Sequence, residues 1–114
     1  LVDTADVLVA MSQEGYDKFL PILKDKGTLL YDEVLVEKLQ KHNGLTVYSI
    51  PATRIAEDLG KKIVANIVML GFMTSHTDMV SPEAMEAAIR DSVPEKFIDL
   101  NVKAFKTGYE YKGK

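Results

Sequence analysis

The sequence predicts an α/β fold in which a mostly parallel sheet lies between layers of helices. Short apolar segments that resemble strands occur at residues 5–11, 28–31 and 45–50, and helix-like segments separate or follow them. Nearly continuous apolar strands are typical of sheets that helices cover on both faces. Alternation of strands and helices along a chain favours parallel pairing. We therefore expect a three-layer domain around a thin sheet.

The first helix is expected directly after the strand at 5–11. Ser12 is a favoured N-cap residue, and Glu14 in the first turn complements the helix dipole. Pro21 predicts a kink or an early end, because proline lacks the amide proton of the helix ladder. The apolar residues at helical spacing are Tyr16, Phe19, Leu20 and Leu23.

Turns and a second helix candidate precede the third strand. Residues 25–27 (Asp-Lys-Gly) and 43–44 (Asn-Gly) have the composition of turns. Leu35 and Leu39, with charged residues between them, allow a short helix within residues 33–42.

The segment after the third strand predicts the central helix of the domain. It begins near Thr53, pauses at Gly60, and becomes apolar on nearly every side over residues 63–73. A helix that is apolar all round is a buried helix. Asn66 interrupts this segment, and a buried amide there would need hydrogen-bond partners.

Two more helices are expected before the C-terminus. Ser81 and Pro82 suit the cap and the first turn of one helix. Ser92 and Glu95 have the spacing of a capping box for the last helix. Residues 109–114 are expected to form a loose tail.

Composition and charge exclude several classes of protein. A chain of 114 residues has the size of one domain, so we predict a single domain over 1–114. The net charge of −3 provides no attraction to nucleic acid. The absence of cysteine excludes disulfides, thiol nucleophiles and cysteine-ligated metal clusters. The apolar run 63–73 is shorter than the roughly 20 residues of a membrane span, and we expect a cytoplasmic protein.

Catalytic and metal-binding patterns are weak. Ser12, His76 and Asp78 include the residue types of a hydrolase triad, but no G-x-S-x-G elbow surrounds a serine. His76 follows an apolar helix, which favours a role at the helix end. His42 and His76 lack the spacing of a metal motif. We expect no catalytic residue and no metal ligand.

Two strand-to-helix junctions carry the candidate site. Ser12 and Gln13 follow the first strand, while Thr53 and Arg54 follow the third. Ligands of doubly wound folds bind at the carboxyl ends of the strands, often at helix N-termini. Ser12 and Thr53 are interpreted either as ordinary caps or, with Gln13 and Arg54, as an edge that faces a ligand or a neighbouring subunit.

Four segments carry a family resemblance, in the same order along the chain. They are residues 6–16 (DVLVAMSQEGY), 50–71 (IPATRIAEDLGKKIVANIVMLG), 80–90 (VSPEAMEAAIR) and 100–110 (LNVKAFKTGYE). Together they resemble the gamma subunit, or gamma domain, of the 2-oxoacid:ferredoxin oxidoreductases. The last two segments are most similar to the 2-oxoglutarate type.

The resemblance implies a non-catalytic subunit of a larger enzyme, inactive alone, with a structural or coenzyme A-facing role. Such assemblies oxidatively decarboxylate a 2-oxoacid, form an acyl-coenzyme A and reduce ferredoxin. Thiamine diphosphate, magnesium and iron–sulfur clusters are expected in other parts of the assembly. The expected partners are subunits of the alpha, beta and delta types, ferredoxin through the assembly, and a second copy of the chain.

The sequence departs from the family at its start. Members begin with a strand and a glycine-rich G-x-G-G-Q-G turn, which this sequence lacks. We therefore expect the C-terminal part of a gamma domain. Pyruvate-type and branched-chain-type members remain alternatives, as does a stand-alone α/β binding module without a redox role. Copurification with thiamine-binding and cluster-bearing chains would distinguish the enzyme subunit from the module.

Overall fold

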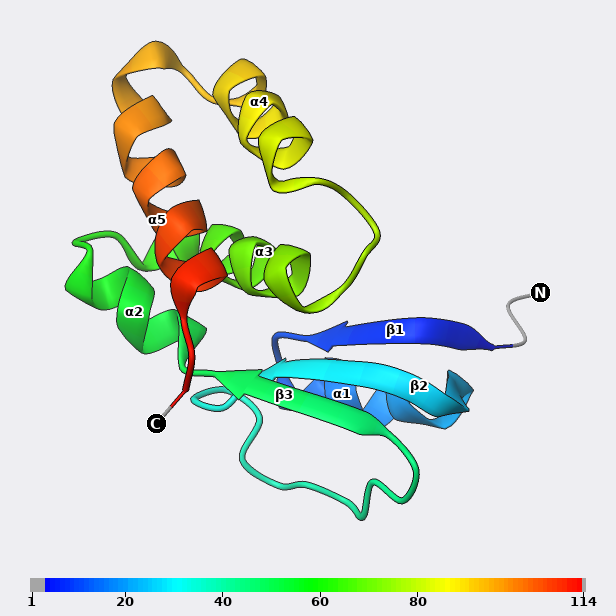
Figure 1. Ribbon diagram of the computed structural model, residues 1–114. Helices are drawn as coiled ribbons and strands as arrows, with labels where there is room; N and C mark the ends of the chain where they lie inside the picture. Colours follow the sequence, from blue (N-terminus) through cyan, green and yellow to red (C-terminus); the bar gives the residue numbers. More distant parts are fainter. Residues whose placement is uncertain (1–3, 114) are drawn as a thin grey trace. The chain divides into compact units, whose positions relative to one another are not determined.

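The chain divides into two compact units, Leu1–Pro51 and Ala52–Lys114, where the sequence predicts a single domain. The computed structural model describes residues 4–113, so Leu1–Asp3 and Lys114 lie outside the described residues. The first unit contains the sheet and one α-helix, and the second unit is helical (Figure 1).

The sheet of the first unit is parallel, which confirms the predicted α/β class. Among the described residues it has three strands in the order β1-β2-β3, namely β1 (Ala5–Ala10), β2 (Leu23–Asp32) and β3 (Thr46–Ile50). The central strand β2 pairs in parallel with both neighbours. Its residues Leu29 and Leu30 are fully buried, as expected for the middle of a covered sheet.

The start of β2 differs from the prediction. Leu23, predicted in a helix, is its first residue and pairs with Ala5, whereas Val7 already pairs with Thr28. The residues 24–27 therefore form a bulge within the strand, and the predicted turn at 25–27 is wrong. The helix ends sooner because Pro21 opens a separate 3-10 turn at Leu20–Ile22.

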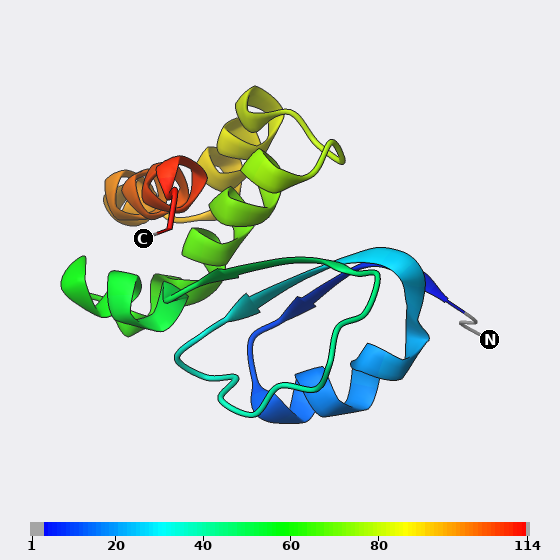
Figure 2. The same ribbon diagram turned by 60° about the horizontal axis from the view of Figure 1, so that its bottom comes forward.

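Helix α1 (Gln13–Phe19) covers one face of this sheet (Figure 2). Its predicted cap is confirmed, because the Gly15 amide donates to Ser12 Oγ at 2.9 Å. Tyr16 is fully buried and joins Ala10, Leu29 and the loop residue Val36 in the core of this unit. The short helix expected as a possibility within residues 33–42 does not form. A turn at 33–35 leads into a segment without helix or strand.

The second unit has four α-helices among its described residues: α2 (Ala52–Asp58), α3 (Ala65–His76), α4 (Pro82–Ser92) and α5 (Ile98–Glu110). Gly60, at φ +101°, ends the α2 region where the sequence predicts a pause. The Ser81 cap of α4 is confirmed, since the Ala84 amide donates to Ser81 Oγ at 3.1 Å.

Two predictions about the end of the chain are wrong. Ser92 does not begin a capping box, because it is the last residue of α4 and its hydroxyl donates to the Ile89 carbonyl oxygen. Helix α5 includes Tyr109 and Glu110, which the sequence assigned to a tail. The ring of Tyr111 then lies edge-on to Phe72, 5.9 Å between centroids.

Helix α3 is not buried all round. Its buried residues are Ala65, Val68, Met69, Gly71, Phe72 and Thr74. Ile63, just before the helix, is 82% exposed. Asn66 is also exposed, so its amide needs no buried partner. The apolar composition overestimated burial because α3 packs chiefly on one neighbour, α5, and that contact covers only part of its surface.

Candidate functional site

The carboxyl ends of the strands form the candidate site of the first unit. Because β1, β2 and β3 are parallel, Ala10, Asp32 and Ile50 end at one edge of the sheet. The Glu33 amide donates to the Ile50 carbonyl oxygen at 3.0 Å and ties two strand ends together. The edge therefore includes Ser12, which follows β1, and the start of the loop 33–45, which follows β2. The loop then runs back toward the start of β3 (Figure 1).

Gln13 fastens this loop to α1. Its Oε1 accepts from the amides of Glu37 and Lys38, both at 2.9 Å. Its Nε2 donates to the Lys38 carbonyl oxygen at 2.9 Å and to Asp17 Oδ1 at 3.0 Å. The amide of Gln13 thus fills its hydrogen-bonding capacity within the first unit. This arrangement makes Gln13 a residue that positions the loop.

Tyr16 fastens the same loop one turn further along α1. The Gln40 amide donates to the Tyr16 hydroxyl at 2.8 Å. His42 Nε2 lies 2.5 Å from that hydroxyl, and the two rings meet edge-to-face. His42, interpreted from the sequence as a solvated turn residue, is therefore a partner of a buried tyrosine. The amphipathic spacing of Tyr16 showed its burial but not the target of its hydroxyl.

Asp32 is a buried carboxylate that none of the sequence patterns described above indicates. It is fully buried at the end of the central strand, and its Oδ1 accepts from the Val34 amide at 2.9 Å. Its carbonyl oxygen accepts from the amides of Leu35 and Val36. Asp32 therefore builds the turn at the site edge. An aspartate directly after an apolar strand was the available signal.

Thr53 and Arg54 belong to the second unit. Thr53 is the second residue of α2 and is 4% exposed, so the prediction that it caps the helix is wrong. The helix begins one residue earlier because Pro51 ends the strand and Ala52 already has helical geometry. Arg54, in the next position, is exposed. Ser12 and Gln13 share the start of α1, whereas Thr53 and Arg54 share the start of α2.

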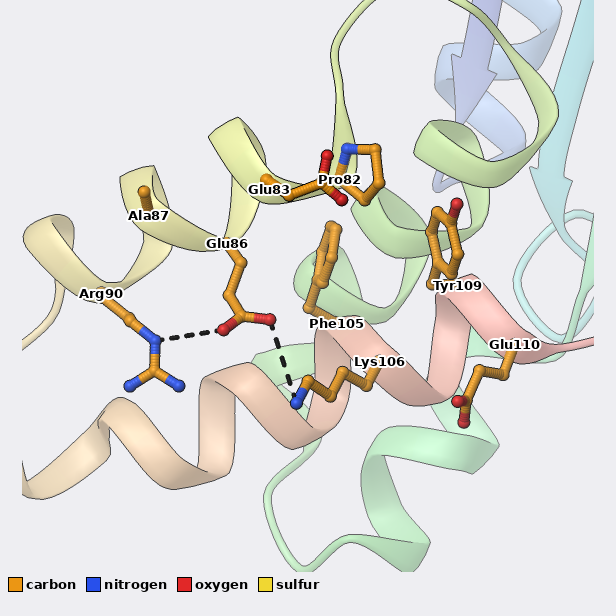
Figure 3. A pocket seen from close by; sticks show the side chains of 9 residues that line it. All are labelled: Pro82, Glu83, Glu86, Ala87, Arg90, Phe105, Lys106, Tyr109 and Glu110. Carbon is orange, nitrogen blue, oxygen red and sulfur yellow. Dashed lines mark hydrogen bonds and ion pairs between the residues drawn. The ribbon is translucent and has the colours of Figure 1, made fainter.

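A concave region of the helical unit lies between α4 and α5 (Figure 3). This cleft of about 550 Å³ is charged. The Glu86 carboxylate lies 3.2 Å from Arg90 Nε and 4.0 Å from Lys106 Nζ. The Glu86–Arg90 pair lies within α4, and only the longer Glu86–Lys106 pair connects α4 to α5. Surface pairs of this kind contribute about 0–1 kcal/mol each, so this connection is weak.

His76 has the helix-end role that its position favours. Its Nδ1 lies 2.9 Å from the Phe72 carbonyl oxygen and 2.8 Å from Ser75 Oγ. Within residues 4–113, no three histidine, aspartate or glutamate side chains converge into a metal-binding group. In that same part of the chain, no helix is both long and apolar enough to cross a membrane.

Comparisons with known proteins agree with the family resemblance. The family model for pyruvate ferredoxin/flavodoxin oxidoreductase matches residues 1–111. The 2-oxoglutarate synthase subunit KorC of Methanocaldococcus jannaschii is 49% identical over 108 residues, which cover 92% of this chain and 57% of that protein. KorC of Methanothermobacter marburgensis is 38% identical over 115 residues, with 96% and 62% covered.

A solved structure gives the same result. The keto/oxoacid ferredoxin oxidoreductase gamma subunit from Geobacter sulfurreducens matches with a TM-score of 0.88 and 44% identity, covering 93% of this chain and 63% of that one. The chain thus spans about three fifths of the length of these relatives. The resemblance to gamma subunits is confirmed, and the chain belongs to the pyruvate ferredoxin/flavodoxin oxidoreductase family.

Proposed function

We propose that this chain acts as part of the gamma subunit of a cytoplasmic 2-oxoacid:ferredoxin oxidoreductase, with 2-oxoglutarate as the substrate. The assembly would cleave the bond between the carboxylate and the oxo carbon, release carbon dioxide, transfer the acyl group to coenzyme A and pass the electrons to ferredoxin. The observation that carries this proposal is the 49% identity to a 2-oxoglutarate synthase subunit.

The chain's own part in this reaction is structural. Iron–sulfur clusters are bound chiefly by cysteine thiolates, and this sequence contains no cysteine. Its side chains therefore do not fit a cluster, and other subunits, of the alpha, beta and delta types, would hold the clusters, thiamine diphosphate and magnesium. Gln13 and Tyr16 act inside the fold, where they hold the loop 33–45 against α1.

Coenzyme A or a partner subunit would meet the chain through exposed groups. Of the predicted site residues, Arg54 combines exposure with a permanent positive charge. Guanidinium groups bind phosphate and carboxylate in a bidentate manner. Arg54 is thus the residue that we propose for this contact. Ser12 and Gln13 support the backbone of the first unit, and Thr53 supports that of the second.

Reconstitution tests the function. The purified chain and the remaining subunits are assayed separately and together for ferredoxin reduction, with coenzyme A, thiamine diphosphate and magnesium present. We expect turnover of 2-oxoglutarate only in the complete assembly. Turnover by the chain alone contradicts the structural role. Faster turnover of pyruvate or of a branched-chain 2-oxoacid would assign the assembly to one of these alternative substrate types.

The Arg54 contact needs its own variant. Arg54→Glu reverses an exposed charge and should change the free energy of unfolding by no more than about 0.5 kcal/mol. In the complete assembly it should raise the coenzyme A concentration needed for half-maximal rate, or weaken subunit affinity. Lys112→Glu makes a matched change at another exposed cation and should do neither. Equal behaviour of the two variants contradicts the Arg54 role.

A further inference from the structure

An apolar groove lies within the second unit, between the start of α3 and the start of α5. It measures about 410 Å³. Its apolar lining comprises Ile63, Val64, Ile67, Val93, Pro94, Phe97 and Leu100. One wall includes residues of the 3-10 turn at Lys62–Val64, and the other includes Phe97 of the 3-10 turn at Glu95–Phe97. The two walls are therefore far apart in the sequence.

Ile63 makes this groove different from an ordinary surface hollow. Its side chain is 82% exposed, the largest exposed fraction among the large apolar residues that the structure describes. Ile67, Phe97 and Leu100 are half-buried beside it. Single exposed apolar residues are common, but contiguous ones around a concavity mark interaction sites. Burial of an isoleucine side chain is favourable, so a partner that covers Ile63 gains affinity.

The charged residues nearest the groove are mostly lysines. Lys61 is the charged residue of its lining, and Lys62 follows it in the chain. On the opposite wall, Lys96 Nζ lies 5.1 Å from the centre of the Phe97 ring. Glu95 and Asp99 are exposed acidic residues next in the chain to the lining residues Pro94 and Leu100, but neither of them lines the groove. A positive rim on an apolar groove complements a partner that is apolar at its centre and acidic at its edges.

We propose that this groove docks an apolar segment with acidic flanking residues from another subunit of the oxidoreductase. The proposal rests on the proposed function, because it takes the partner from the same assembly. A second copy of this chain fits less well. A two-fold contact would place the lysine rims of both copies opposite one another, and like charges in apposition oppose association.

The test measures binding of the full chain to the purified complex of the remaining subunits. Ile63→Asp removes the apolar anchor and adds a negative charge, and we expect at least about tenfold weaker binding. Lys61→Glu combined with Lys62→Glu should also weaken binding about tenfold and reduce its dependence on salt. Met79, which is 61% exposed and absent from the lining of the groove, provides the control: Met79→Asp should bind like the wild type.

The outcomes separate the two proposals. Wild-type binding that Ile63→Asp leaves unchanged overturns the groove as the docking site while the proposed function stands. Equal losses for Ile63→Asp and Met79→Asp overturn it as well, because the effect would then be general. Failure of the wild-type chain to bind contradicts the proposed function and the docking partner together. Self-association in analytical ultracentrifugation that Ile63→Asp abolishes would assign the groove to a second copy instead.

Discussion

Replacing Gly71 by alanine should disrupt the contact between α3 and α5. A Cβ atom at Gly71 would overlap the carbonyl oxygen of Phe105 and lie 2.8 Å from the Tyr109 nitrogen. Gly108 faces α3 in the same way, since its Cβ would overlap the Val68 carbonyl oxygen. The two helices thus approach backbone to backbone, and glycine permits this distance because it has no side chain.

The size of the effect follows from these contacts. The clashing groups are backbone atoms, which cannot rotate away, so relief requires the helices to separate by roughly 1 Å. A radial gap of about 0.5–1 Å already forfeits a quarter to a half of each van der Waals contact along the interface. Overpacking of this kind costs about 1–3 kcal/mol or more, and the better helix propensity of alanine offsets about 1 kcal/mol. Because both clashes are with backbone atoms, we take the upper end of this range and expect Gly71→Ala to lower the free energy of unfolding by about 2 kcal/mol after the offset.

Urea denaturation of the full chain, followed by far-UV circular dichroism, measures this loss in the helical unit. Gly15→Ala is the matched control, because Gly15 is also helical and its added Cβ would meet only the Ser12 side chain, at 3.1 Å. It should shift stability by less than about 1 kcal/mol. The double variant of Gly71 and Gly108 should lose less than the sum of the single losses, because one separation relieves both clashes. Wild-type stability of Gly71→Ala would refute the close crossing.

Two further predictions concern burial and loop attachment. Phe72→Ala should lower the free energy of unfolding by about 3–5 kcal/mol because Phe72 is 3% exposed. Ile63→Ala should change it by no more than about 0.5 kcal/mol, because Ile63 is 82% exposed. Equal losses in urea denaturation would contradict this difference in burial. Tyr16→Phe removes the hydroxyl that accepts from the Gln40 amide and should lower the free energy of unfolding by about 1–3 kcal/mol. Hydrogen exchange should become faster at the Gln40 amide and stay slow at Leu29. Unchanged exchange at Gln40 would contradict this attachment of the loop.

The order of strands and helices could be predicted from the sequence because it depends on local patterns. The cap at Ser12, the cap at Ser81 and the break at Gly60 each follow from one residue and its immediate neighbours. Burial of the α3 segment could not be predicted in the same way. Whether Ile63 or Phe72 is covered depends on which neighbour packs there, and apolar composition alone carries no such information.

The candidate site shows the same limit at the level of single side chains. The location of the edge follows from parallel pairing, and Ser12 and Gln13 lie at its start as predicted. The loop partners of Gln13 are backbone groups of Glu37 and Lys38, more than twenty residues away, and no local pattern indicates them. Thr53 is buried because the helix begins at Ala52, one residue before the favoured cap.

The attachment of the loop 33–45 determines how variants at this edge should be interpreted. A segment of this length without helix or strand is typically functional or mobile, and here α1 holds it through Gln13 and Tyr16. Changes at either residue should therefore loosen the loop before they alter any contact with coenzyme A or a subunit. A defect in assembly caused by Tyr16→Phe would report loop geometry, whereas a defect caused by Arg54→Glu would report an exposed charge. Hydrogen exchange in the loop distinguishes the two causes, because only the Tyr16 variant should increase it.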